Sequence, residues 1–451
     1  MKGNLLLKAP ERVGPEEAVA RGSRAVDHHT GIISRLFEHM VEPDDIDVFF
    51  FTGILSDTSR FLPRQCHRHN GGCSSLSKQK AKAAAICECF ERYCAGTYRD
   101  EDLICDSYKN VADRAVSPDR FVLFSQNQYK QPDFRFTPFS REAPVRWVEG
   151  YSLTEDRTVL IPASFVYTPY TFLNIKERFR TPISTGLACG NSIEEAILMG
   201  LYEVVERDAL MITWLNRLSP PLVDVESIDD SPLQDLIARH RKKGVKAYLA
   251  DITTDLSIPT FLALTESERG NGAAVTVGSA SRVSPKQAML KALEESAHAR
   301  NWVKIMMRTR EPIAPTDDFS FVQDFPDHPF LYGHAFMLPQ TQFIRASQAS
   351  LRFDDLPDPQ DESILSNLRY CLRVLADKGY DVIAVDITSP DVADLGFSVV
   401  RVAVPELQPI SVEVGYRCLG GNRLYEVPVR LGHRDRPITE EEINPYPHPL
   451  P

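Results

Sequence analysis

The sequence lacks the long hydrophobic run that a membrane-spanning helix requires. Its most apolar stretch, DVFFFTGIL, is far shorter than the roughly 20 residues of such a helix. The start, MKGNLLLKAPER, has only three consecutive leucines, too few for the core of a secretory signal. Because the chain has nine cysteines and no recognisable export signal, we expect a cytoplasmic protein with reduced thiols.

An excess of positive charge is also missing. Lysine and arginine total 51 against 62 acidic residues, so the formal net charge is −11. This balance argues against broad binding of nucleic acid or of an anionic membrane, but leaves room for a local phosphate pocket. With 43% hydrophobic and 25% charged residues over 451 positions, the composition is typical of a globular protein with a large core.

Several common catalytic motifs do not occur. The small-residue loop STGLACGNS precedes an expected helix and suits phosphate binding, but no Gly-Lys-Ser/Thr follows it. Neither Gly-x-Ser-x-Gly nor His-Glu-x-x-His is present. The stretch CHRHNGGC offers Cys66, His67, His69 and Cys73 as zinc ligands. No second pair with zinc spacing accompanies it, so a glycine-bearing loop before a helix is the favoured interpretation.

Local patterns predict a mixed α/β (α+β) fold. Long helices are expected over 77–95 and 192–215, and a third from Ser284 with a Ser–Gln capping box. The stretch IDVFFFTGIL predicts a buried strand. KKGVKAYLADITTD and DKGYDVIAVDITSPD each read as a helix end, a capping glycine and a strand, which indicates internal pseudo-duplication. We expect an N-terminal segment (1–60) packed on a main domain (61–440), with a proline-rich tail (441–451).

Two helices carry the same acidic pattern. Glu-x-x-Glu-Arg occurs at Glu88, Glu91 and Arg92, and again at Glu203, Glu206 and Arg207. Residues three and four apart lie on one helical face, and apolar neighbours around both patterns predict burial. Buried carboxylates need cations or hydrogen bonds, and Mg²⁺ prefers carboxylate and phosphate oxygens. Spacing alone leaves two interpretations open: a metal–phosphate site or a structural ion-pair network.

Glu195 also has two interpretations. It follows Ser192 by three residues, which predicts a capping box at the start of the second long helix. It also follows the small-residue loop, which places it close to the expected phosphate site.

The C-terminus, NPYPHPLP, places a proline at every second position up to Pro451. Proline fixes φ, so this pattern predicts a stiff, extended segment. One interpretation is an exposed rod or a ligand for a proline-binding groove. The other is that the rod carries the terminal carboxylate to a defined place.

Taken together, several stretches of the sequence resemble the YcaO superfamily and, within it, the SagD-like azoline-forming cyclodehydratases of thiazole/oxazole-modified peptide biosynthesis. The resemblance extends from about residue 31 to the C-terminus. It is carried by AAAICECFERYCAG, STGLACGNSIEEAILMGLYEVVERDALMITWLNR, ALEESAHAR, GNRLYEVPVRLG and EEINPYPHPLP.

The resemblance implies a fold that binds ATP and Mg²⁺. The metal ligands that it implies are Glu88, Glu91, Glu195, Glu203 and Glu206. The positions around the nucleotide are Arg92, Asn191, Arg207 and Arg300. The chain departs from the family at Cys73–Ser75, where Gly-Lys-Gly is common, and at Ala84, Lys291 and His298. Lys80, or one of its neighbours Lys78 and Lys82, is therefore expected to supply the missing positive charge.

The implied reaction is ATP-dependent cyclodehydration of Cys, Ser or Thr in a ribosomally made precursor peptide. The amide oxygen is phosphorylated, phosphate leaves, and a thiazoline or oxazoline remains, with the carboxylate of Pro451 as a catalytic group. The resemblance also implies a leader-peptide-binding partner resembling ubiquitin-activating enzymes, a flavin dehydrogenase in the same complex, and a homodimer. Backbone thioamide or amidine formation and a non-catalytic ATP-binding scaffold are the alternatives.

Overall fold

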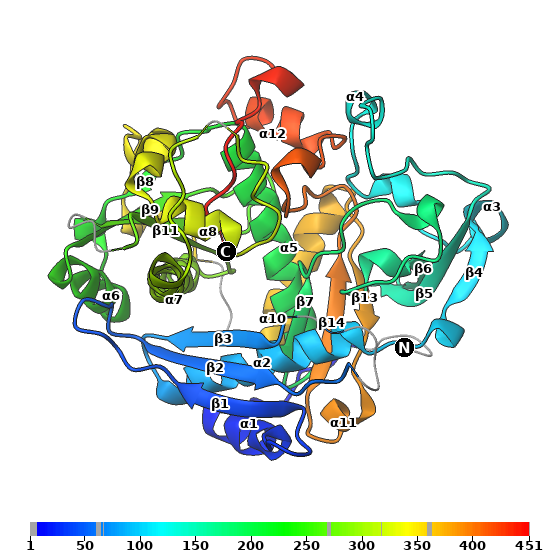
Figure 1. Cartoon of the computed structure of the whole chain (residues 1–451), viewed down its shortest axis with the longest axis horizontal. Helices are drawn as coiled ribbons and strands as arrows, with labels where there is room; N and C mark the ends of the chain where they lie inside the picture. Colours follow the sequence, from blue (N-terminus) through cyan, green and yellow to red (C-terminus); the bar gives the residue numbers. More distant parts are fainter. Residues whose placement is uncertain are drawn as a thin grey trace.

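The computed structural model describes residues 7–59, 65, 67–267, 272–316, 318–358 and 363–450. The first of its three sheets is antiparallel, in the order β1 (Ile33–Glu38), β2 (Phe49–Leu55) and β3 (His69–Ser74). Helix α2 (Lys78–Gly96) packs on β2 and β3, and α1 (Pro15–Gly22) packs on α2. Figure 1 shows this sheet at the bottom of the molecule. The predicted strand in IDVFFFTGIL is confirmed as β2.

The second sheet has the order β11–β10–β9–β8–β12. Its strands are β8 (Leu222–Val223), β9 (Val245–Asp251), β10 (Thr260–Ser267), β11 (Val275–Ser281) and β12 (Ser350–Leu351). All its pairs are antiparallel except β12 with β8. Helices α6 (Ser231–Lys242) and α7 (Pro285–Thr309) pack against it.

The third sheet has the order β4–β5–β13–β14–β7, and β6 pairs with β5. Its strands are β4 (Ile104–Ser107), β5 (Pro144–Ser152), β6 (Arg157–Pro162), β7 (Leu187–Gly190), β13 (Ile383–Asp386) and β14 (Ser398–Ala403). Helix α5 (Ile193–Leu215) packs on β7 and β14, and α10 (Ile364–Asp377) packs on α5. Because α5 also contacts β11, it connects the second and third sheets.

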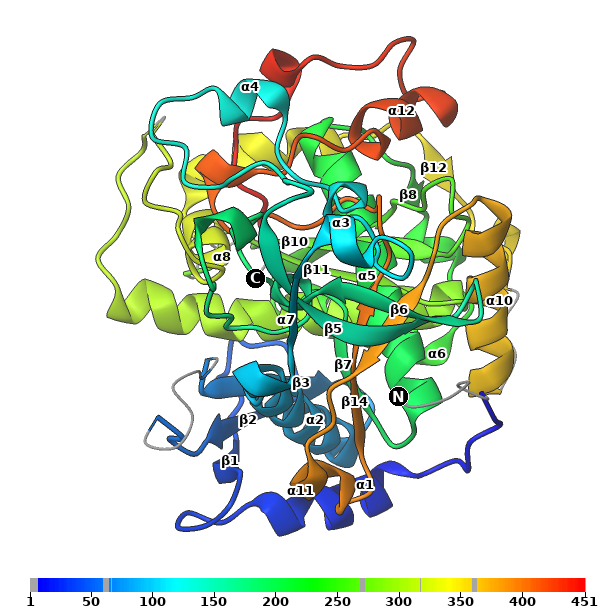
Figure 2. The same cartoon turned by 90° about the vertical axis from the view of Figure 1, so that its right-hand side faces the viewer.

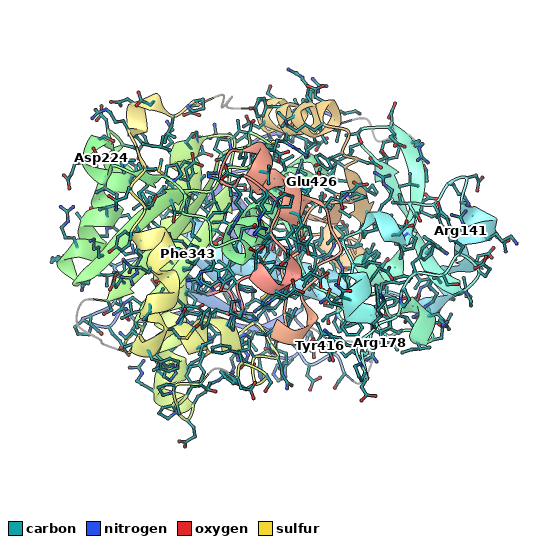
Figure 3. All side chains as sticks on the ribbon, turned by 90° about the horizontal axis from the view of Figure 1, so that it is seen from above. Arg141, Arg178, Asp224, Phe343, Tyr416 and Glu426 are labelled. Atoms are coloured by element: carbon teal, nitrogen blue, oxygen red, sulfur yellow. The ribbon has the colours of Figure 1, made fainter. Side chains whose placement is uncertain are left out.

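The remaining α-helices are short. They are α3 (Tyr108–Val111), α4 (Gln126–Tyr129), α8 (Asp327–Tyr332), α9 (Gln342–Arg345), α11 (Pro390–Ala393) and α12 (Arg423–Arg430). Seen from above, the C-terminal region with Tyr416 and Glu426 lies between two halves of the molecule, one carrying Phe343 and the other Arg178 (Figure 3).

The mixed α and β class is confirmed, and so are the three long helices. Both echoing segments are helix-to-strand units, α6 to β9 and α10 to β13, and both capping glycines have positive φ. The capping box at the start of α7 is wrong: Ser284 makes no side-chain cap, and its hydroxyl donates to Asp358 at 3.3 Å.

Candidate functional site

The α2 carboxylates lie where the second half of that helix passes β7. Ser77 caps the helix by accepting from the Lys80 amide at 3.4 Å. Arg92 Nη2 donates to Glu88 Oε1 at 2.5 Å, an i,i+4 ion pair. Glu91 Oε1 accepts from the backbone N–H of Cys189 at 2.9 Å. The helix therefore presents one arginine-paired carboxylate and one held by a backbone amide of β7.

The α5 carboxylates are held by a similar set of groups. Arg207 pairs with both, at 3.4 Å to Glu203 and at hydrogen-bonding distance to Glu206. The backbone N–H of Gly186 donates to Glu203 Oε2 at 3.0 Å, and Ser279 of β11 donates to Glu206 Oε1 at 2.6 Å. Every one of these carboxylates thus has a defined orientation.

The segment around β7 brings the two helices together. The amides of Gly186 and Cys189, three residues apart, bind Glu203 of α5 and Glu91 of α2 respectively. Gly190 allows this approach, because a Cβ there would lie 2.6 Å from the Ala196 amide of α5. The predicted meeting of the two Glu-x-x-Glu-Arg patterns is therefore present in the structure.

Burial is the main influence on the pKa values of these carboxyl groups, and repulsion between them adds to it. Burial raises the pKa of Glu91 well above its ordinary value, and the neighbouring Glu88 adds to the effect. Burial also raises the pKa of Glu203. The pKa of Glu206 rises to about 7, because burial outweighs the opposing effect of Arg207. Such groups gain from a nearby cation more than exposed carboxylates do.

The carboxylates are not fully exposed to solvent, and they do not form one compact set of metal ligands. The side chains of Glu88, Glu203 and Glu206 are 30%, 26% and 7% exposed. Among the described residues, these glutamates do not bring three ligand atoms within 4.8 Å of one another. Mg²⁺ commonly uses only one or two protein carboxylates together with phosphate oxygens. The arrangement therefore fits cations held jointly by protein and nucleotide.

Asn191 and Glu195 form a local network at the start of α5. The Asn191 backbone amide and side-chain amide donate to Glu195 Oε2 at 2.8 and 3.1 Å, and Arg21 of α1 donates to Asn191 Oδ1 at 2.6 Å. Ser192 accepts from the Glu195 amide at 3.1 Å. The expected capping box is only half formed, because Glu195 reaches the residue before the cap.

Helix α7 contributes groups that sequence reasoning did not assign. Glu294 accepts from the Ser75 amide and hydroxyl at 2.5 and 2.7 Å, and from the Ser74 hydroxyl at 3.2 Å. The stretch that departs from Gly-Lys-Gly is therefore bound by an acid 219 residues away. Lys291 pairs with Glu295 at 3.1 Å, and Glu295 raises the pKa of Glu206. The adjacent glutamates in ALEESAHAR, Glu294 and Glu295, are the sequence feature from which these contacts could have been suspected.

His298, one of the family departures, packs against the first sheet. Its ring centroid lies 4.2 Å from that of Phe50, and a Cβ at Gly71 would lie 2.5 Å from its Cε1. Burial, together with nearby Lys291, lowers the pKa of His298 to about 4. The imidazole is therefore neutral at physiological pH.

Lys80 and Arg300, two residues expected to contact the nucleotide, lie away from the glutamates of α2 and α5 and from Glu295. Lys80 is exposed in the first turn of α2, about 12 Å along the helix from Glu88 at 1.5 Å per residue. Arg300 is 2% exposed and donates to the carbonyl of Ala273 at 3.0 Å. It follows Glu295 by five residues, which is about 140° around α7. The structure therefore presents Arg300 on a different face of α7 from Lys291 and Glu295.

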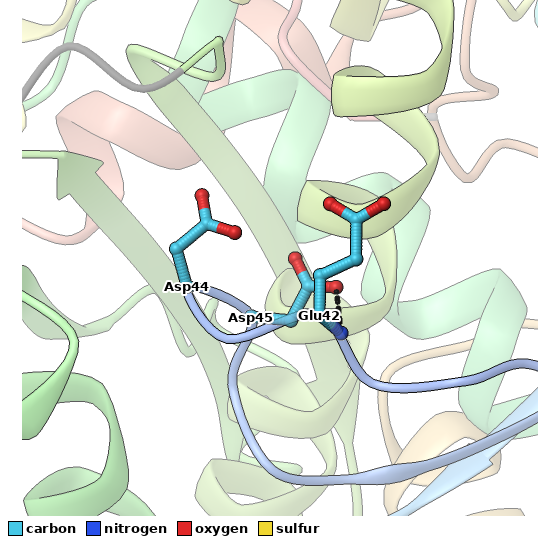
Figure 4. Close-up of side chains that lie close together, drawn as sticks. All are labelled: Glu42, Asp44 and Asp45. Atoms are coloured by element: carbon cyan, nitrogen blue, oxygen red, sulfur yellow. Dashed lines mark hydrogen bonds between the residues drawn. The ribbon is translucent and has the colours of Figure 1, made fainter.

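A second acidic cluster lies in the loop between β1 and β2. Figure 4 shows Glu42, Asp44 and Asp45, whose carboxylate oxygens lie within 4.8 Å of one another. Lys304 of α7 contacts all three, at 3.1, 2.8 and 2.5 Å, and Arg308 pairs with Glu42 at 2.9 Å. The two cations offset most of the negative charge of the three carboxylates and hold the loop against α7.

The proline-rich tail is buried along most of its length. Trp214 donates to the Tyr446 carbonyl at 3.0 Å, and Tyr332 donates to the Pro447 carbonyl at 2.7 Å. The His448 ring stacks on His328 at 3.9 Å. The last described residues of the tail lie beside α8, which carries both His328 and Tyr332 (Figure 1, Figure 2). The exposed-rod interpretation is therefore wrong for residues 446–450.

The tail packs against the C-terminal part of α5, where Trp214 lies. Burial lowers the pKa of His448 well below its ordinary value, and Arg207 is among the charges that contribute. Leu450 is 2% exposed in the core. Pro451 lies outside the described residues.

The stretch CHRHNGGC, which offered four potential zinc ligands, forms no metal site among the described residues. Cys66 lies outside the described residues, and His69 begins β3 as an exposed residue. Cys73 is buried and donates its thiol to the Glu294 carbonyl at 3.3 Å. The stretch thus continues into β3, which leads to α2.

Comparison with known families agrees with this geometry. The model for the family described as "YcaO cyclodehydratase, ATP- and Mg²⁺-binding" matches residues 73–408. The chain belongs to the YcaO family. The matched region ends before the proline-rich tail and contains Glu88, Glu91, Glu195, Glu203 and Glu206.

Individual proteins and solved structures are also similar to this chain. An uncharacterized protein of Methanothermobacter thermautotrophicus is 29% identical over 340 residues, which are 75% of this chain and 81% of the relative. A heterocyclase solved in complex with substrate and cofactor is 27% identical, with a TM-score of 0.79 over 99% of this chain and 59% of the other. The heterocyclase TruD is 28% identical, with a TM-score of 0.67 over 82% and 50%. This YcaO chain thus spans between half and three fifths of those two heterocyclases.

No described helix of this YcaO protein combines the length and the apolar character that a membrane crossing needs.

Proposed function

We propose that this protein is an ATP- and Mg²⁺-dependent cyclodehydratase that converts Cys, Ser or Thr of a ribosomally made peptide to thiazoline or oxazoline. The observation that carries the proposal is the joining of α2 and α5 through β7, which orients four buried or half-buried carboxylates. Membership of a family described as ATP- and Mg²⁺-binding supports it, as does similarity to a heterocyclase bound to substrate and cofactor.

The donor set suits divalent cations. We assign Glu88, Glu91, Glu203 and Glu206 as metal ligands, because hard cations prefer carboxylate oxygens and would offset the burial and the mutual repulsion that raise three of their pKa values. We place Glu195 at the edge of the same set. Bound Mg²⁺ would supply charge neutralisation for the phosphates of ATP.

The nucleotide phosphates would lie against the arginines of the same helices. Arg92 and Arg207 can donate bidentate hydrogen bonds to phosphate oxygens once the carboxylates are neutralised. The Asn191 side chain, held by Arg21 and Glu195, marks the start of α5, where backbone amides favour anions. Lys80 and Arg300 remain predictions as nucleotide contacts.

The proposed reaction begins when the substrate side-chain oxygen or sulfur loses its proton to a base and attacks the preceding amide carbon. The carbonyl oxygen becomes an oxyanion and takes the γ-phosphoryl group of ATP, which breaks the bond to ADP. Loss of the amide proton then expels phosphate and forms the C=N bond. Holding both reactants in line is the main demand of such a transfer.

We assign the removal of a proton to the carboxylate of Pro451. The burial of residues 446–450 and the contacts of Trp214 and Tyr332 support a tail directed inward rather than into solvent. Fixed φ angles at alternate positions lower the entropy lost on ordering this segment.

Peptide recognition is proposed to need a partner. We expect a separate leader-peptide-binding protein resembling ubiquitin-activating enzymes, and a flavin dehydrogenase where the rings are oxidised to azoles. A homodimer also remains a prediction.

Mass spectrometry of a candidate precursor peptide tests the function. With this protein, its partner, ATP and Mg²⁺, the peptide should lose about 18 Da, one water, for each ring. An unchanged peptide mass with a partner that demonstrably binds the leader would refute the proposal. Modification that requires added sulfide would assign the enzyme to thioamide formation instead.

A further inference from the structure

A small cavity lies against the part of α5 that carries Glu203 and Val204. Its volume is about 40 Å³, and its polar lining comes from Arg180, Thr185, Arg401 and Gln408. Val204, the residue after Glu203, forms part of the wall. A water needs roughly 10–15 Å³ of such volume, so the cavity holds a few waters or one small tetrahedral ion.

The cavity is positively charged. Arg401 is 3% exposed, and its Nη2 donates to the carbonyl of Ile183 at 2.8 Å, while its Nη1 has no hydrogen-bond partner. Arg180 lies over the ring of Phe165 at 4.8 Å. Within the described part of the chain, neither arginine forms an ion pair with a carboxylate. A buried guanidinium group at Arg401, with the half-buried Arg180 beside it and no counter-ion for either, is costly to fold, which points to an anionic ligand.

The cavity also presents one acceptor. Gln408 donates its side-chain amide to the Cys418 carbonyl at 2.8 Å, which fixes the orientation of the group. Its Oε1 is buried and has no donor. A ligand that satisfies Arg401 and Gln408 together must therefore accept hydrogen bonds and also donate one. Hydrogenphosphate does both, whereas a carboxylate or sulfate only accepts.

The position of the cavity links it to the proposed reaction. Thr185 precedes Gly186, whose amide holds Glu203. The charges of Glu203 and Arg92 also act on Arg401, which places it within electrostatic range of the glutamate site. An anion in the cavity would lie next to the phosphates bound by α2 and α5.

We propose that the cavity is a binding site for the inorganic phosphate released from the phosphorylated amide. Arg180 and Arg401 donate to the phosphate oxygens, and the P–OH group donates to Gln408. The inference rests on the proposed function, because that reaction releases phosphate at the glutamate site, and the cavity lies within electrostatic range of that site. The competing explanation is a pair of buried waters bridging Arg401 and Gln408.

Calorimetric titration of the nucleotide-free protein with inorganic phosphate, and separately with sulfate, tests this site. The wild-type protein should bind phosphate at least tenfold more tightly than sulfate, since sulfate leaves Gln408 without a donor. Arg401→Gln should weaken phosphate binding at least tenfold, and Arg401→Lys should recover part of it. Gln408→Met, which keeps the volume, should bring phosphate and sulfate to similar affinities.

The results separate this inference from the proposed function. Mg-ATP titration of the same variants reports the glutamate site, and its affinity should stay within about threefold of wild type in Gln408→Met. Phosphate binding that Arg401→Gln leaves unchanged, or equal affinity for phosphate and sulfate in the wild type, would overturn the inference and assign the cavity to water. If Arg401→Gln does not fold, the selectivity measured with Gln408→Met decides between these outcomes.

Discussion

Replacing Glu206 with Gln should stabilise the ligand-free protein at pH 8, although the change removes one member of an ion pair. Burial raises the pKa of this carboxyl group from an ordinary 4.5 to about 7, despite Arg207. Each pKa unit corresponds to about 1.4 kcal/mol, so keeping Glu206 ionised in the folded state costs on the order of 3 kcal/mol. We expect about 1–3 kcal/mol of added unfolding free energy, since Gln keeps an acceptor for Ser279.

The pH dependence of stability shows whether ionisation of Glu206 stabilises or destabilises the fold. A carboxyl group whose folded pKa is raised stabilises the fold fully below its unfolded pKa of about 4.5 and loses that stabilisation as pH rises through about 7. The difference between Glu206→Gln and wild type should therefore be near zero at pH 4.5 and reach its full size by pH 8. Urea denaturation in EDTA across this range measures it.

The two interpretations of the glutamate helices predict opposite results here. In a structural ion-pair network, removing one partner of a buried pair costs about 3–5 kcal/mol. In a metal–phosphate site, the variant gains stability in EDTA but loses the stabilisation given by Mg-ATP, about 2.7 kcal/mol at a hundredfold excess over Kd. Destabilisation at pH 8 with an intact Mg-ATP effect would refute our reasoning. Glu226→Gln, at an exposed pair with Arg241, is the matched control and should change stability by less than about 0.5 kcal/mol.

Three further outcomes are expected. Glu203→Gln should lower Mg-ATP affinity at least tenfold in a calorimetric titration, and unchanged affinity would remove its assignment as a ligand. Removing Pro451 alone should leave the melting temperature within about 2 °C of the wild-type value, because the contacts of residues 446–450 remain. Ring formation measured by mass spectrometry should nevertheless fall more than tenfold. Glu294→Ala should cost about 2–4 kcal/mol in urea denaturation, because it leaves buried donors of Ser74 and Ser75 without an acceptor, and a loss below about 1 kcal/mol would contradict this.

The sequence was sufficient to predict the helices that carry the glutamates. Apolar residues around most of α2 and α5, together with serine caps, specify helix and burial locally. The spacing of the acids then determines which side chains share a face. Both steps depend only on residues within one helix, which is why they succeeded.

Contacts between distant segments could not be predicted in this way. The amide of Cys189 in β7 holds Glu91, the amide of Gly186 just before β7 holds Glu203, and Ser75 donates to Glu294. These bonds join segments that no periodic pattern relates. Arg401 also gave no signal, because an arginine within a strand is usually read as solvent-facing. Its burial results from packing in the third sheet, between β13 and β7.

Under the proposed function, the free protein and its Mg-ATP complex would differ in the groups that neutralise these glutamates. In the structure, Arg92 neutralises Glu88, and Arg207 neutralises Glu203 and Glu206, so the carboxylates are partly compensated before any cation binds. A divalent cation competes for the same oxygens, and the displaced guanidinium groups remain on the helix face where the phosphates would lie. Because phosphate accepts bidentate hydrogen bonds from arginine, each ion pair that opens is replaced by a new one. Under this proposal, the arginines lower the cost of burying the acids in the free protein and would remain available to the nucleotide in the complex.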